Sequence, residues 1–161
     1  MSAENGSATR PLARPVAGFT AAGWSLMFAL IHVAWAAGWY VGLQPEEARA
    51  AFQRPWFYRY NLLAAGLCAL VIPVALALTR SFKDRLTIRL LIFLAGSVTA
   101  ILALRGIAGV VKAGYLGVTG QAVLSPMFLW DLWFCLGATL FGTAVWHFRR
   151  LCGERLQPRK S

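Results

Sequence analysis

The chain has 161 residues, of which 58% are hydrophobic and only 14% are charged, and its net charge is +10. Soluble domains average about 45–50% apolar and about 25% charged residues, so this composition excludes an ordinary soluble domain and predicts a membrane protein. A soluble protein this basic would be expected to bind nucleic acid. Here the cations lie mainly between apolar runs, where they set orientation and meet anionic lipid headgroups. We therefore expect membrane lipids, and no nucleic acid, as partners.

Four apolar runs are each long enough to cross a bilayer, because a spanning helix needs about 20 residues. Residues 19–42 form the first run, which is too long to be the apolar core of a signal peptide. The other three cover residues 57–78, 88–112 and 126–148. The predicted fold class is all-α, a polytopic membrane four-helix bundle over residues 18–148. We expect a disordered cytoplasmic tail before it (1–17) and a basic cytoplasmic tail after it (149–161).

The cations are divided unevenly between the two ends of these spans. Of the 16 Lys and Arg residues, eleven lie in the two tails and around the loop between the second and third spans, and five lie toward the opposite side. Cytoplasmic segments carry the excess of Lys and Arg, so both termini are predicted to be cytoplasmic. The expected localisation is the cell membrane (the bacterial inner membrane), as a multi-pass protein.

The first span carries a histidine within its apolar run. His32, Trp35 and Trp39 are spaced i, i+3 and i+7, so they share one face of a helix. Trp39 and Tyr40 suit the membrane interface, which places His32 roughly 10 Å below it. His32 is either a buried, hydrogen-bonded histidine or an acid/base or ligand-binding group. The segment PEEARAAF (45–52) then predicts a short helix in the outer loop.

The second and third spans add polar groups at the same side of the membrane. The second span begins near Arg59 and Asn61, and the third carries Arg105, Gly109 and Lys112 along one face. A charged side chain at mid-helix costs about 2.5–3.5 kcal/mol, so it is expected to face the bundle or water. The long side chain of Lys112 can extend to the headgroups. Arg105 therefore needs a partner inside the bundle.

The fourth span supplies that partner. Asp131 lies five residues into the span, roughly 8 Å below the interface, and it shares a face with Cys135 and Ala138. We predict an ion pair between Arg105 and Asp131, with the polar faces of the spans directed at a shared interior. The pair is interpreted either as a structural contact that fixes helix register or as part of a ligand-binding or catalytic site.

Together these groups predict a ligand pocket in the outer half of the bundle. The candidate ligand-binding residues are Trp35, Arg59, Asn61, Arg105, Lys112 and Trp130, and the candidate catalytic residues are His32, Asp131 and Arg105. Because the cations outnumber the one buried acid, an anionic group such as a lipid phosphate would suit the pocket. A volume above roughly 300 Å³ is expected for a ligand site. Without such a site, the two tryptophans are simply packing residues.

Neither a cofactor nor a metal is expected. The three cysteines form no C-x-x-C pair, which argues against a disulfide framework or a redox pair. His32 and His147 lie near opposite membrane faces, so a histidine-based metal site is not predicted. The chain also has no serine elbow and no nucleotide-binding loop.

Three stretches resemble an uncharacterised family of small four-span bacterial membrane proteins: HVAWAAGWYVG (32–42), LRGIAGVVKAGYLG (104–117) and the region around Asp131. That family has a similar His-x-x-Trp-Ala-x-Gly stretch, an Arg-Gly/Ala-Ile-like turn and an acidic residue opening its fourth span. The stretch GVVK (109–112) departs from it, because the family tends to be more polar there. The resemblance covers residues 19–148.

The resemblance implies the four-span fold and the importance of His32, Trp35, Arg105 and Asp131. It assigns no activity to any of them.

Three functions stay open on the sequence alone. The first is a protein that binds a small-molecule or lipid ligand. The second is a membrane-embedded enzyme, with His32 as general acid/base and Arg105 as electrostatic stabiliser. The third is an accessory or structural subunit that packs against a membrane-protein partner or a second copy of itself. A transporter is less favoured, because the chain shows no inverted repeat.

Overall fold

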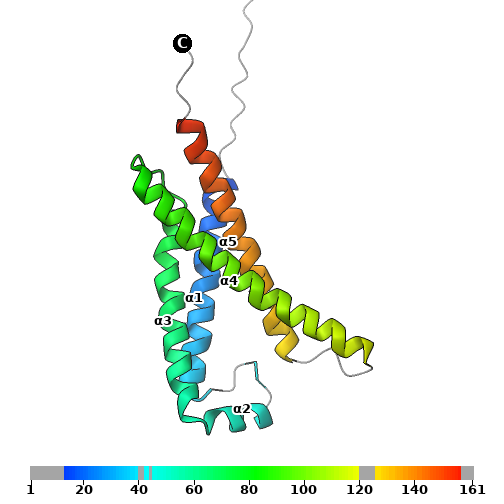
Figure 1. Ribbon diagram of the computed structural model, residues 1–161. Helices are drawn as coiled ribbons and strands as arrows, with labels where there is room; N and C mark the ends of the chain where they lie inside the picture. The colour runs from blue at the N-terminus through cyan, green and yellow to red at the C-terminus, as the bar shows by residue number, and fades with distance from the viewer. Residues whose placement is uncertain (1–12, 40–41, 44, 120–125, 157–161) are drawn as a thin grey trace, which may run out of the picture.

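The computed structural model describes residues 13–39, 42–43, 45–119 and 126–156 (Figure 1). Within these ranges the fold is all-helical, which confirms the predicted class. The helices are α1 (Ala13–Ala36), α2 (Pro45–Phe52), α3 (Pro55–Ala77), α4 (Arg85–Val118) and α5 (Pro126–Leu156). The four long helices are each long and apolar enough to cross a membrane. The short helix α2 confirms the helix predicted in the loop between the first two spans.

The helix ends differ from the predicted spans in ways that the local sequence explains. Helix α1 ends at Ala36, although the apolar run continues to residue 42, because Gly38 adopts a left-handed backbone with φ of 84°. The start of α1 at Ala13 makes residues 13–17 of the predicted disordered tail helical. Helix α5 likewise continues to Leu156, past the predicted span end, since a basic segment leaves the membrane without breaking a helix.

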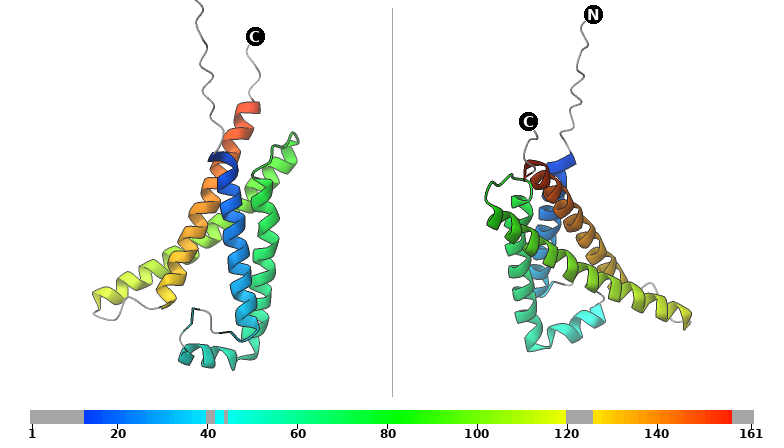
Figure 2. Two further views of the ribbon diagram at one scale, coloured as in Figure 1. Left: turned by 180° about the vertical axis from the view of Figure 1, so that it is seen from behind. Right: turned by 45° about the horizontal axis from the view of Figure 1, so that its top comes forward.

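The long helices pack as two antiparallel pairs, α1 with α3 and α4 with α5, and α1 joins the pairs by packing on α5. Figure 1 shows α4 crossing α5 obliquely, so that its second half runs away from α1 and α3. The two views in Figure 2 show the same divergence. Helix α2 and the first turns of α5 lie at one end of the bundle, called here the α2 end. The start of α1 and the last turns of α5 lie at the other end, called here the basic end.

An aromatic cluster holds the pairs together near the middle of the bundle. Trp24 is buried and stacks on Trp133, with ring centroids 5.9 Å apart. Its indole lies over Gly137, where an added Cβ would overlap the ring, so the glycine lets α1 and α5 approach closely. Phe28 and Phe141 complete this buried core.

The contact between α4 and α5 depends on two glycines of α4. A Cβ at Gly106 would lie 2.9 Å from the backbone nitrogen of Cys135, and a Cβ at Gly109 would overlap the carboxyl group of Asp131. The prediction that Asp131 and Cys135 face a neighbouring helix is therefore confirmed. The two side chains occupy the space that the missing Cβ atoms leave.

The prediction of which face of the third span points inward is wrong: the buried face is rotated by about one residue from the face that carries Arg105 and Lys112. Its buried positions include Gly106, Gly109 and Ala113, whereas Lys112 is exposed and Arg105 is half exposed. The small residues form the interface because only they let the two backbones come close. Arg105 flanks this interface and reaches across it to α5.

Candidate functional site: an aromatic pocket at the α2 end

The buried histidine of α1 is held by an asparagine of α3. His32 is 4% exposed and Asn61 is fully buried. The distance from Nδ1 of His32 to Oδ1 of Asn61 is 2.7 Å. Asn61 lies at the α2 end of α3, and the antiparallel packing of α3 on α1 brings it to the depth of His32. The pair confirms that these two polar groups meet in the interior.

The orientation of the Asn61 amide decides which nitrogen of His32 carries the proton. Nδ2 of Asn61 donates to the backbone carbonyl of Phe57 at 2.8 Å, and a carbonyl can only accept. The amide oxygen must then be the atom that faces His32, so Nδ1 of the imidazole donates to it. In the neutral ring the other nitrogen, Nε2, carries the lone pair and can accept a hydrogen bond.

The predicted ion pair is confirmed. Nη1 of Arg105 donates to Oδ1 of Asp131 over 2.5 Å, joining α4 to α5. The Asp131 side chain is 10% exposed and that of Arg105 is 51% exposed, so the acid is buried while about half of the arginine side chain is open. The guanidinium carbon of Arg105 also lies 5.1 Å from the ring centroid of Phe134, a cation–π contact.

Two tryptophans form a corner beside these polar groups. The rings of Trp35 and Trp130 meet edge to face with centroids 5.0 Å apart, and Trp35 meets the His32 ring in the same way at 5.1 Å. Nε1 of Trp130 donates to the backbone carbonyl of Gly42 at 3.1 Å. This bond fastens the segment after α1 to the start of α5.

The space enclosed by these groups is a partly open pocket of about 220 Å³. Side chains from α1, α2, α3, α4 and α5 line it, together with one residue of the segment between α1 and α2. The lining residues are Phe28, His32, Trp35, Leu43, Ala51, Phe57, Tyr60, Arg105, Trp130 and Phe134. The pocket is therefore an aromatic chamber with an imidazole, a guanidinium and the phenol of Tyr60 as its polar groups.

The structure brings together some of the residues proposed from the sequence and separates others. His32, Trp35, Arg105 and Trp130 line the pocket. Asn61 and Asp131 stand directly behind it, each bonded to one of the polar lining groups. The remaining two, Arg59 and Lys112, are exposed and do not line it.

The sequence reasoning missed most of the aromatic wall. Phe28 precedes His32 by four residues and Phe134 follows Trp130 by four, so helical spacing places each beside a recognised residue. Phe57 bears the same relation to Asn61, four residues before it, whereas Tyr60 directly precedes Asn61 and has no such spacing. Aromatic residues are so frequent in the spans that this spacing alone did not single them out.

The pocket is smaller than expected. Its volume of about 220 Å³ falls below the roughly 300 Å³ that begins the usual range for ligand sites. A chamber of this size has room for a head group or a single ring. Within the described ranges, no group of three or more His, Cys, Asp or Glu residues is arranged to hold a metal ion.

Comparisons with family models, with curated proteins and with solved structures give no match to this chain. The family resemblance proposed from three short stretches thus stays a prediction. Function has to be argued from the pocket itself.

Proposed function

We propose that this protein binds a small amphipathic ligand, such as a lipid, with its head in the aromatic pocket at the α2 end. The single observation that carries the proposal is the composition of the chamber. It places one half-exposed arginine side chain, one hydrogen-bonding imidazole and the phenol of Tyr60 within walls that are otherwise apolar and aromatic. Ligand sites commonly combine an apolar lining with a few polar groups that fix orientation.

The head of the ligand is best matched by a group that accepts hydrogen bonds and carries one negative charge. Asp131 occupies one N–H of Arg105, and a guanidinium has five donors in a planar fork. The others suit a carboxylate or a phosphate oxygen. Because Arg59 and Lys112 stand outside the chamber, the surplus of positive charge predicted from the sequence is not found among its described lining residues. Arg105 is the one cation of that described lining and already pairs with Asp131, so it is the remaining N–H donors of Arg105 that favour an anionic head.

The size of the chamber supports a ligand that extends beyond it. About 220 Å³ accommodates a head group or a single ring but not a whole lipid. An acyl or prenyl chain would leave through the open side and lie in the membrane, where about 0.8 kcal/mol for each buried CH₂ group holds the ligand in the bilayer beside the pocket.

We also propose the orientation and setting of the molecule. The distribution of Lys and Arg favours cytoplasmic termini, so the basic end faces the cytoplasm and the aromatic pocket opens in the outer half of the membrane. The four apolar helices support a multi-pass membrane protein. The ligand would then enter from the outer leaflet.

The test uses dibrominated stearate, whose bromines quench tryptophan fluorescence and whose head is a carboxylate. We expect saturable quenching of the purified protein in detergent, weakened about tenfold in Arg105→Gln because a hydrogen bond to a charged group contributes roughly 1.5–3 kcal/mol. Arg59→Gln is the matched control, since it removes the same charge from an exposed residue outside the pocket. The methyl ester of the probe should bind as weakly to the wild type as to Arg105→Gln. Equal losses in the two arginine variants would refute the proposal.

A second candidate function is proton-transfer catalysis in the same chamber. The observation that favours it is the fixed tautomer of His32, which leaves Nε2 with a lone pair in the same chamber as Arg105, whose guanidinium would stabilise a developing negative charge. His32→Gln keeps a hydrogen-bonding side chain but cannot act as a base. Full biological activity in that variant would exclude catalysis by His32 while leaving ligand binding intact.

A further inference from the structure

The last turns of α5 form a second hollow at the basic end, far from the aromatic pocket. It has a volume of about 340 Å³ and is lined by Gly142, Val145, Trp146, Arg149 and Arg150. These positions are spaced i, i+3, i+4, i+7 and i+8, so all five lie on one face of the helix. Gly142 provides the floor, because it has no side chain to fill the groove.

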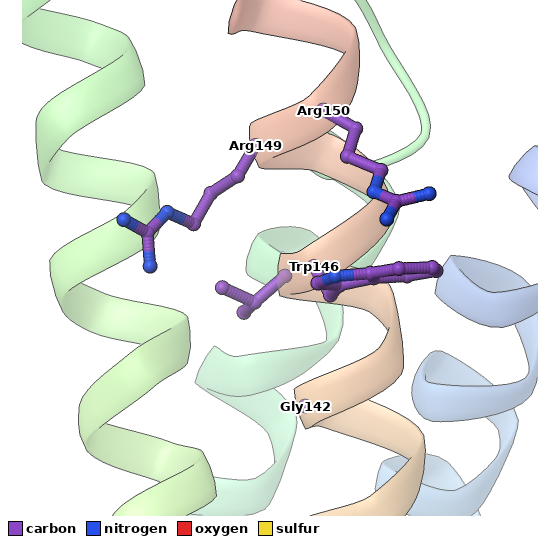
Figure 3. Close-up of a pocket in the computed structure, with 5 residues that line it drawn as sticks. Gly142, Trp146, Arg149 and Arg150 are labelled. Carbon is purple, nitrogen blue, oxygen red and sulfur yellow. The ribbon is translucent and has the colours of Figure 1, made fainter.

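Two guanidiniums stand at the top of this groove. Figure 3 shows Arg149 and Arg150 reaching to opposite sides of α5, with Arg150 lying over the indole of Trp146. The guanidinium carbon of Arg150 is 3.8 Å from the centroid of that ring, a close cation–π contact. Stacking on the indole restricts the position of the cation before any ligand arrives.

No carboxylate whose side chain the structure describes forms an ion pair with either arginine. Asp84, at the same end of the bundle, instead accepts hydrogen bonds from the hydroxyl and the backbone N–H of Thr87. The two positive charges are exposed together at the end of a membrane-spanning helix, where the headgroups of a bilayer lie. Trp146 and the two arginines could simply anchor the helix at the membrane surface, but such anchoring needs no cavity. This site has a hollow below the charges, which favours a bound molecule.

We propose that this groove binds an anionic phospholipid of the leaflet at the basic end. The phosphate lies beside the stacked guanidinium of Arg150, and Arg149, which reaches to the other side of α5 in Figure 3, turns toward it to donate further N–H groups. One acyl chain runs down α5 past Trp146 and over Gly142. The charge of the groove selects anionic over zwitterionic headgroups, and its apolar floor distinguishes a lipid from a free phosphate ion.

Native mass spectrometry of the full chain, titrated with phosphatidylglycerol or phosphatidylcholine in mixed micelles, tests the proposal. We expect phosphatidylglycerol to bind at least about tenfold more tightly than phosphatidylcholine, and this preference to be lost in Arg149→Gln/Arg150→Gln. The matched control is Arg85→Gln/Arg89→Gln, which removes the same charge from exposed positions at the basic end. We expect it to change the affinity no more than roughly twofold, because these charges lie outside the groove.

A third variant separates the groove from general electrostatics. Gly142→Leu leaves both arginines in place but fills the floor, where a Cβ would already lie 3.4 Å from the Thr99 side chain. We expect it to weaken phosphatidylglycerol binding while circular dichroism shows unchanged helicity. Wild-type affinity in Gly142→Leu, equal losses in the two double variants, or displacement of the lipid by millimolar inorganic phosphate would each overturn the proposal. None of these results bears on the aromatic pocket, which contains none of these residues.

Discussion

The amide of Asn61 determines the state of His32 in the interior of the bundle. The two side chains are 2.7 Å apart, and the second hydrogen bond of the amide, to the carbonyl of Phe57, leaves only its oxygen for the imidazole. The asparagine therefore acts as a positioning residue, since it orients the ring that lines the pocket. Both partners are almost completely buried, so neither can exchange this bond for one to water.

Replacing Asn61 with alanine should destabilise the fold. The buried Nδ1 of His32 would lose its partner, which costs about 1–3 kcal/mol. The free energy of unfolding can be measured by titration with sodium dodecyl sulfate in mixed micelles. Leu63→Ala is the control, because Leu63 lies two residues along on the outside of α3 and is 64% exposed. Equal stability of the two variants would show that the His32–Asn61 bond contributes nothing.

The ion pair between α4 and α5 should show measurable coupling. A double-mutant cycle of Arg105→Gln and Asp131→Asn is expected to give a coupling energy of about 1 kcal/mol. This value lies between those of exposed ion pairs and of fully buried charged hydrogen bonds, because the arginine side chain is 51% exposed and the aspartate 10%. The same unfolding titration measures it. Strictly additive effects would mean that the contact does not hold the helices together.

Two glycines of the same helix should respond oppositely to alanine. Gly106→Ala places a Cβ 2.9 Å from the backbone of Cys135, so α4 and α5 must separate, at a cost of roughly 1–3 kcal/mol. Gly114→Ala meets nothing within 4 Å and should be neutral or stabilising by up to about 1 kcal/mol, through its higher helix propensity. Thermal unfolding of both variants in one detergent makes the comparison. A stabilised Gly106→Ala would contradict the close packing.

The cap of α4 should depend on pH. The hydroxyl and the backbone N–H of Thr87 donate to the carboxylate of Asp84, and these bonds hold the pKa of Asp84 below its usual 3.8. A lowered pKa means that the cap stabilises the folded state above the usual pKa, and that this contribution disappears as the pH falls through the folded value. Titration of the Asp84 carboxyl carbon by NMR should give a midpoint below 3.8, moving upward in Thr87→Ala. A midpoint at or above 3.8 in the wild type would contradict the capping role.

The sequence was sufficient to predict the spans and the Arg105–Asp131 pair. Long apolar runs can only become helices in a membrane, and charges stranded at equal depth are strongly driven to pair. The same reasoning could not place Lys112, because depth says nothing about which side of a helix faces its neighbours. That choice was made by Gly106 and Gly109, because small residues mark a face where helices can approach but do not say which helix packs there.

The aromatic residues that line the chamber could not be predicted from sequence patterns either. Phe28 and Phe134 have the same spacing as many lipid-facing residues, and only the crossing of the two helix pairs places them in one chamber. The short helix α2 was predicted, but its contribution of Ala51 to the lining depends on how the loop folds back. Such relationships come from tertiary packing and not from periodicity.

The most direct test of the central claim, that the aromatic chamber is a ligand site, is to fill it without altering a polar group. Ala51→Trp introduces a large side chain from α2 into the lining and leaves His32 and Arg105 unchanged. Saturable quenching by dibrominated stearate should be lost in this variant. Because the substitution adds a fluorescent indole, quenching is expressed as a fraction of the signal that each protein gives without the probe. Quenching with wild-type affinity in Ala51→Trp would contradict the claim.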